Sequence, residues 1–156
     1  MKRYLPLVVL VVIAALAAKA LSHSSAQSFA WMHYFMGFFF CQFAMLKLFN
    51  VSGFAEGFEM YDLVAKKLRG YALVYPFIEL GLGLSYLAFF RPMLTYTITV
   101  IVMGVSAIGV VRALRKGLDV RCACMGTVLN VPLSTVTLTE DLVMGVMALW
   151  MLLSGM

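Results

Sequence analysis

Five long apolar runs, separated by short polar connections, constrain this chain more than any other feature of its sequence. They cover residues 5–18, 29–49, 71–90, 93–114 and 138–153, and the helix of the first run should reach Leu21. A helix needs about 20 apolar residues to cross the hydrocarbon core of a bilayer, and most of these runs approach that length. Because 63% of the 156 residues are hydrophobic and only 12% are charged, no sizeable soluble domain fits beside the runs. The sequence therefore predicts an all-α integral membrane bundle with five spans.

The first run has flanks that set it apart from the others. Lys2 and Arg3 precede it, and Lys19 with a serine-rich connection follows it. Cleaved signal peptides share this layout, but we expect a retained span here. We therefore divide the chain into an N-terminal transmembrane helix with an external loop, residues 1–28, and a four-helix membrane domain, residues 29–156.

The segment between the second and third runs has the pattern of an amphipathic helix. Apolar side chains recur there at helical spacing, and the charged ones fall largely on the other side: Phe54, Phe58, Tyr61, Val64, Ala65 and Leu68 against Glu56, Glu59, Asp62, Lys66, Lys67 and Arg69. This pattern is typical of a helix that lies in the headgroup region. We expect an interfacial helix at about residues 54–69 that anchors the loop. The alternative is a docking surface for a soluble partner.

Basic residues are distributed unevenly between the two sides that five spans would create. If the N-terminus is cytoplasmic, ten of the twelve Lys and Arg residues lie on that side, and only Lys19 and Arg91 lie outside. This positive-inside bias predicts a multi-pass protein of a bacterial-type inner (cytoplasmic) membrane whose C-terminus is external. The same bias explains the net charge of +5, so the basic residues do not indicate a nucleic-acid partner. The lipid bilayer is the partner that the sequence does imply.

The connection before the last run carries the most reactive side chains. Cys122 and Cys124 are one residue apart, and Met125 follows them. Thiolates attack disulfides, and soft sulfur ligands bind Cu(I) and Hg(II). Because no charge occurs from Cys122 to Thr139, we expect this cysteine loop, residues 117–137, to dip into the bundle from the cytoplasmic side. The alternative is an exposed loop that rests on the headgroups.

Two side chains within the runs are candidates for the same site. Glu79 lies well inside the third run, and an ionisable residue there is costly enough to indicate function. Its structural alternative is a protonated carboxyl that hydrogen-bonds a neighbouring group. Cys41 should lie at the same depth, since each residue is eight positions from a cytoplasmic helix end, or about 12 Å at 1.5 Å per residue. A buried cysteine alone is more often simple packing.

Polar residues near the ends of the runs have structural explanations. Lys47 should extend to the cytoplasmic interface, as a lysine near a helix end ordinarily does. The alternative is a pairing of Lys47 with Glu79 or Asp141. Thr137 and Glu140 fit a capping box that opens the last helix, and Asp141 would stand in the same first turn, where the helix dipole favours negative charge. A weaker alternative gives Glu140 or Asp141 the role of accepting protons from ionising thiols.

Two further patterns concern helix starts and helix packing. Pro92 fits the first turn of the fourth helix, where its missing N–H costs nothing. Gly81 and Ser85 form a small-x-x-x-small pattern of the kind that permits close helix approach.

Several segments together resemble one known family, the MauE/DoxX-like redox-associated membrane proteins. They are Gly37-Phe38-Phe39-Phe40, residues 43–49, Gly53-Phe54, Pro76-Phe77-Ile78-Glu79-Leu80 and Cys122-Ala123-Cys124-Met125-Gly126. The resemblance covers about residues 31–153. It implies a four-helix DoxX-like membrane core, so that the first run is an added helix, and a role in electron or thiol traffic. The methylamine-utilisation branch is linked to disulfide maturation of a periplasmic dehydrogenase subunit, and relatives occur beside glutaredoxin-like and heavy-metal-handling soluble proteins, which are the expected partners.

Three functional hypotheses follow, and whether the protein is an enzyme stays open. In the first, Cys122 and Cys124 shuttle between dithiol and disulfide, with Cys41 as a third thiol and Glu79 as proton acceptor. In the second, the chain is a heavy-metal transporter for Cu(I) or Hg(II). Its metal ligands would be Cys122, Cys124, Met125, Cys41 and Glu79. A second metal site, the outer station near the external membrane surface, would consist of Met32, His33 and Met36. In the third, the chain is a non-catalytic assembly partner. A quinone is conceivable in the apolar bundle, although no residue encodes one, and the sequence contains no phosphate-binding loop or hydrolase triad.

Overall fold

The computed structural model describes residues 5–27, 29–117 and 133–155, with side chains of the last segment described from Leu138 onward. Within these residues the chain forms six helices and no strand. In chain order they are α1 (Leu5–Ser22), α2 (Ala30–Leu48), α3 (Val51–Glu59), α4 (Arg69–Leu87), α5 (Pro92–Arg115) and α6 (Leu133–Leu153). The prediction of an all-helical membrane protein is confirmed.

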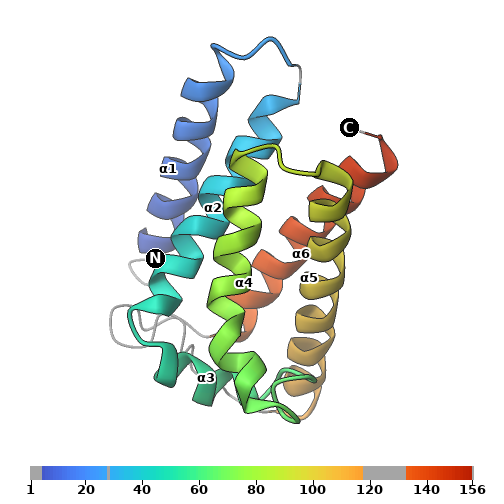
Figure 1. The fold of residues 1–156 in the computed structure, drawn as a ribbon. Helices are drawn as coiled ribbons and strands as arrows, with labels where there is room; N and C mark the ends of the chain where they lie inside the picture. Colours follow the sequence, from blue (N-terminus) through green and yellow to red (C-terminus); the bar gives the residue numbers. More distant parts are fainter. Residues whose placement is uncertain (1–4, 28, 118–132, 156) are drawn as a thin grey trace.

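The five long helices run side by side, and the short helix α3 lies across one end of the bundle (Figure 1). The main packing pairs are α1 with α2, α2 with α4, and α5 with α6, while α3 packs mostly on α4. These helices correspond to the five predicted runs. By length and apolar composition, however, the described residues contain two candidate membrane spans, α1 and α5, or three if the bent pair α2 and α3 is one span.

The extent of the predicted interfacial helix, about residues 54–69, is wrong, and its position at a membrane surface stays a prediction. Helix α3 ends at Glu59, and turns occupy residues 60–68 before α4 begins. The helix stops because the Asp62 side chain accepts hydrogen bonds from the backbone N–H groups of Val64 and Ala65, both at 2.9 Å, which hold a turn in place of a continued helix. The apolar face of α3 covers the bundle end: the rings of Phe54 and Phe58 lie 5.8 and 4.5 Å from that of Tyr75 on α4.

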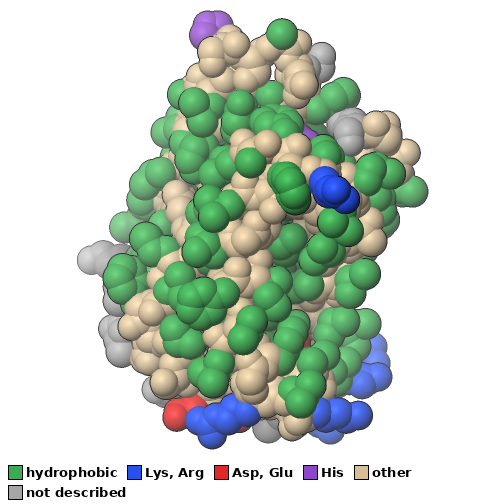
Figure 2. All heavy atoms as spheres, in the orientation of Figure 1, with side chains coloured by type: hydrophobic (Ala, Val, Ile, Leu, Met, Phe, Trp, Pro, Cys, Tyr) green, Lys and Arg blue, Asp and Glu red, His purple; other side chains and the backbone are tan. Residues whose placement is uncertain are grey.

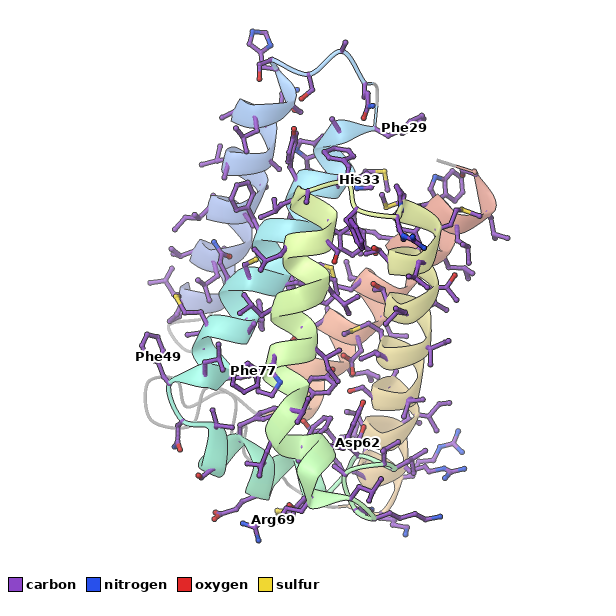
Figure 3. The ribbon with its side chains drawn as sticks, viewed as in Figure 1. Phe29, His33, Phe49, Asp62, Arg69 and Phe77 are labelled. Carbon is purple, nitrogen blue, oxygen red and sulfur yellow. The ribbon has the colours of Figure 1, made fainter. Side chains whose placement is uncertain are left out.

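A sharp bend joins α2 to α3, at an angle of 99°. Asn50 makes the bend locally favourable, because its side-chain oxygen accepts the N–H of Gly53 at 3.0 Å and so caps α3. Phe49, labelled in Figure 3, marks the corner where the chain changes direction. The bend brings α3 beneath the end of α2.

The starts of α5 and α6 test two sequence predictions. Pro92 is the first residue of α5, as predicted. The predicted capping box of Thr137 and Glu140 is wrong, because α6 already begins at Leu133 and Thr137 lies inside it. Pro132 is the last helix-breaking residue before α6, and no residue between Leu133 and Thr137 interrupts a helix.

Helices α2 and α4 are in close contact where Gly37 and Gly83 face each other. A Cβ atom added to Gly83 would lie 2.8 Å from the sulfur of Cys41 and 3.0 Å from the carbonyl oxygen of Gly37. A Cβ on Gly81 would meet nothing within 4 Å. The close approach therefore uses Gly83, and not the Gly81 pattern that the sequence suggested.

Candidate functional site

A buried ion pair joins α2 to α4 near the end of the bundle covered by α3. The ammonium group of Lys47 donates a hydrogen bond to Oε1 of Glu79, and it lies 3.9 Å from Oε1 of Glu140 on α6. Lys47 is only 4% exposed. The expectation that it extends to the membrane surface is therefore wrong, because the bend after α2 places α3 over it.

Aromatic rings surround the ammonium group of Lys47. Its nitrogen lies 5.3 Å from the ring centre of Tyr75, 5.5 Å from that of Phe54 and 6.0 Å from that of Phe43. A cation is attracted to the faces of such rings, most strongly where water is excluded. Three elements, α2, α3 and α4, therefore supply one enclosure for a single positive charge.

Three more carboxylates lie buried around this pair. Glu140 and Asp141 come from α6, and Asp62 comes from the turns between α3 and α4; they are 7%, 3% and 0% exposed. Asp141 is near enough to Lys47, Glu79 and Asp62 for their charges to act on it. Because α6 begins at Leu133, Glu140 and Asp141 stand about two turns inside the helix, where the predicted dipole and capping roles do not apply. We call Lys47, Glu79, Glu140, Asp141 and Asp62 the charge cluster.

Asp62 is fixed to the rest of the bundle through its backbone. A Cβ on Gly109 of α5 would lie 2.7 Å from the carbonyl oxygen of Tyr61 and 3.1 Å from Cα of Asp62, so the glycine allows the turns to touch α5. Burial raises the pKa of Asp62, which lies outside the long helices, while the N–H groups of Ala65 and Val64 and the charge of Lys66 oppose that rise.

Cys41 does not lie at the level of Glu79. Glu79 pairs with Lys47, whereas Cys41 is half-buried against Gly83, about one helical turn further along α4. The predicted equal depth of the two residues is therefore wrong. Cys41 is a free cysteine that packs at the α2–α4 contact.

Three predicted site residues, Cys122, Cys124 and Met125, lie outside the described residues. The structure does give the two ends of their segment. Helix α5 ends at Arg115, the described chain continues to Gly117, and α6 begins at Leu133. Both ends lie toward the end of the bundle where α3 is found (Figure 1). Of the predicted site residues, the structure places Glu79 in the charge cluster and leaves Cys41 apart from it.

His33, a member of the predicted outer metal station, lies in an aromatic cluster, and the station itself stays a prediction. His33 is buried; its Nε2 shares a hydrogen bond with the hydroxyl of Tyr96, and its ring stacks on Phe89 with centres 4.4 Å apart. Figure 3 shows His33 and Asp62 toward opposite ends of the bundle. Over residues 5–27, 29–117 and 138–155, no group of three or more His, Cys, Asp or Glu side chains is arranged to hold a metal ion.

Sequence reasoning missed two members of this region, Asp62 and Ser106. Asp62 was placed on the solvent side of an amphipathic helix, although an aspartate between aromatic and apolar residues also fits a turn. Ser106 lies buried in α5 beside Asp141. Nothing in its local sequence distinguishes it from an ordinary serine in an apolar helix.

Comparison with known proteins gives one result. Residues 25–154 match a protein-family model described as methylamine utilisation protein MauE. The match leaves α1 outside and includes the whole of α2 to α6. The DoxX part of the predicted resemblance stays a prediction. No curated protein and no solved structure matches the chain.

Proposed function

This chain belongs to the MauE family, and on that premise we propose that it is a redox membrane protein whose Cys122 and Cys124 exchange between dithiol and disulfide. The family's description, methylamine utilisation, associates such proteins with redox processes. Two thiols separated by one residue suit that chemistry. A disulfide between them is strained, and strained disulfides are easily exchanged.

The proposed reaction is a transfer of one disulfide between this chain and a soluble dithiol protein of glutaredoxin-like chemistry. A thiolate of one protein attacks the disulfide of the other, a mixed disulfide forms, and the second thiolate of the attacking pair releases the partner as its dithiol. Two electrons and two protons thereby move from one cysteine pair to the other. No other oxidant is needed.

One observation carries the proposal beyond family membership: the two ends of the cysteine segment and the charge cluster share one end of the bundle. Thiols must lose protons before they react, and buried carboxylates and an ammonium group are groups that hold and release protons. We propose Glu79, paired with Lys47, as part of that proton path. Cys41 serves as packing in this account.

The charge distribution supports a cytoplasmic position for this end. In the view of Figure 2, Lys and Arg side chains gather at the end where α3 and the end of α5 lie, and one basic patch is seen near the connection between α4 and α5. Basic residues favour the cytoplasmic side of a membrane. We therefore propose an inner-membrane orientation in which the cysteine segment meets a cytoplasmic partner.

The test counts thiols in purified, reduced protein before and after mild oxidation. We expect the wild-type chain, which has three cysteines, to lose two thiols reversibly and to pass the disulfide to a reduced glutaredoxin. Cys122→Ser and Cys124→Ser should each abolish this transfer. Cys41→Ser is the matched control and should retain it. Transfer by the Cys122→Ser/Cys124→Ser double variant at the wild-type rate would refute the proposal.

Titration of the same reduced protein with Cu(I) and Hg(II) separates the competing functions. One outcome would favour a metal carrier: the protein binds the metal tightly and one to one, loses this binding when Cys122 or Cys124 is replaced, and shows no disulfide transfer. In that carrier Met125 would be a further ligand. Full function of the host pathway in the absence of all three cysteines would assign a non-catalytic assembly role.

A further inference from the structure

The charge cluster has more carboxylates than cations. Glu79, Glu140, Asp141 and Asp62 are all less than 10% exposed, and Lys47 is the one buried Lys or Arg among the described residues. Burying several like charges together is strongly unfavourable, and such groups keep protons rather than remain ionised together. The excess of carboxylates therefore calls for a bound positive species.

Asp141 is the member of the charge cluster whose negative charge is stabilised by the fewest hydrogen bonds and ion pairs. Glu79 accepts a hydrogen bond from Lys47, and Glu140 lies 3.9 Å from the same ammonium. Oδ1 of Asp62 accepts two backbone N–H bonds. Asp141, by contrast, has no cation within ion-pair distance in the part of the chain that the structure describes, and its Oδ2 has no hydrogen-bond partner there.

Ser106 supplies the complementary observation. Its hydroxyl is 1% exposed, lies beside the carboxyl of Asp141, and also lacks a partner with hydrogen-bond geometry among the described residues. A buried polar atom without a partner costs free energy. A hydrogen bond between these two atoms on facing helices, α5 and α6, would satisfy both, and the excess of buried carboxylates around them favours the form in which Asp141 carries the proton.

We propose that Asp141 is a proton-binding site: its carboxyl is protonated at neutral pH and donates a hydrogen bond to the Ser106 hydroxyl. The proton is the ligand, and it links α6 to α5 at the level of the charge cluster. This inference stands on the geometry of the cluster and is independent of the thiol chemistry.

The arrangement favours a proton over a metal cation. A metal ion needs several oxygen ligands at short range, and the described residues offer no group of three or more acidic, His or Cys side chains arranged to hold one. A proton needs only one carboxyl and one acceptor. Asp141 and Ser106 provide that pair.

The groups that face Asp141 determine how the bundle responds when the proton leaves. Lys47 comes from α2, Glu79 and Tyr75 come from α4, and Asp62 comes from the turns before α4, with Glu140 adjacent on α6. Lys47 attracts an ionised Asp141, whereas Glu79 and Asp62 repel it, and burial away from water disfavours its charge further. Proton loss should therefore loosen the packing of α6 against the rest of the bundle.

Infrared difference spectroscopy of the full chain in lipid vesicles tests the proposal. A protonated carboxylic acid has a carbonyl stretching band well separated from the amide bands. We expect such a band at pH 7 and its disappearance as the pH is raised. Labelling all aspartates with ¹³C should shift it, and labelling all glutamates should not. This assignment needs no substitution, so it holds even where a variant fails to fold.

Variants then identify the residue. Asp141→Asn should remove the band, and Ser106→Ala should move it to higher frequency without removing it, because the acid loses its acceptor. Glu56→Gln, at an exposed position on α3, is the matched control and should leave the band unchanged. The absence of a protonated-carboxyl band at pH 7, a band that shifts with labelled glutamate, or loss of the band on adding sodium at constant pH would each overturn the proposal.

Discussion

Lys47 and Glu79 are 32 residues apart in the chain, yet their side chains meet in a buried ion pair between α2 and α4. Each residue lies in an apolar run where an isolated charge is expensive. Their pairing offsets that cost only while both are present, since a charge left alone keeps its full desolvation penalty.

Removing the ammonium group should be more harmful than removing both charges. We expect Lys47→Met to lower the free energy of unfolding by about 3 to 5 kcal/mol, because the charge of Glu79 stays buried without its partner. The double variant Lys47→Met/Glu79→Gln should recover most of this loss. Thermal unfolding in a mild detergent measures both. A double variant as unstable as the single one would show that the pair contributes through shape rather than charge.

The contact between α2 and α4 predicts opposite results at two neighbouring glycines. Gly83→Ala places a methyl group against Cys41 and the Gly37 carbonyl, so we expect a loss of about 1 to 3 kcal/mol in the free energy of unfolding. Gly81→Ala meets open space and should be neutral or stabilising by up to about 1 kcal/mol, since alanine favours helix. Equal effects in the same unfolding assay would contradict the described helix contact.

A second pair of glycines tests how the turns are held against α5. Gly109→Ala would bring a methyl group to within 2.7 Å of the Tyr61 carbonyl oxygen, so the turns at residues 60–68 must move away. We expect faster hydrogen exchange in that segment and little change elsewhere. Gly104→Ala on the same helix has open space and should leave exchange there unaltered. Protection in the turns that is retained in Gly109→Ala would count against their contact with α5.

Asp62 predicts a measurable dependence of stability on pH. Burial raises its pKa in the folded protein above the ordinary value of 3.8, so the folded state holds the proton more tightly than the unfolded state. Its contribution to stability therefore declines as the pH rises from about 3.8 through the raised pKa. Asp62→Asn keeps the oxygen that accepts the two N–H bonds and removes the titration, so its stability should decline less steeply in this range.

Asp62→Ala provides the matching control for that measurement. It removes both the charge and the acceptor of the Val64 and Ala65 N–H groups, and we expect a loss of about 1 to 2 kcal/mol relative to Asp62→Asn. An Asp62→Asn curve that follows the wild-type curve at every pH would show that another group carries the titration.

The apolar runs predicted the long helices because a membrane-spanning helix requires an uninterrupted run of apolar residues, which can be seen in one stretch of sequence. Pro92 predicted a helix start for the same local reason. Lys47 was misassigned because its burial depends on a bend after α2 and on rings from α3 and α4. That arrangement is a property of the assembled bundle, which no local pattern encodes.

The candidate site was predicted unevenly for a similar reason. A carboxylate inside a run is a strong signal, so Glu79 was selected. Glu140 and Asp141 were assigned to a helix start because the capping pattern at Thr137 was favourable, although the helix had begun earlier. Ser106 could not be selected from the sequence, because its role depends on its contact with Asp141 on the facing helix, and only the tertiary structure shows that contact.

The cover that α3 forms over Lys47 makes this amine chemically distinct from other lysines of the chain. Lys66 and Lys67 are exposed and should react readily with an acylating reagent, whereas Lys47 is shielded by rings and engaged with Glu79. Its acylation can proceed only when α3 lifts or the bundle opens. The labelling rate of the Lys47 amine would therefore measure how often this end of the membrane bundle opens locally.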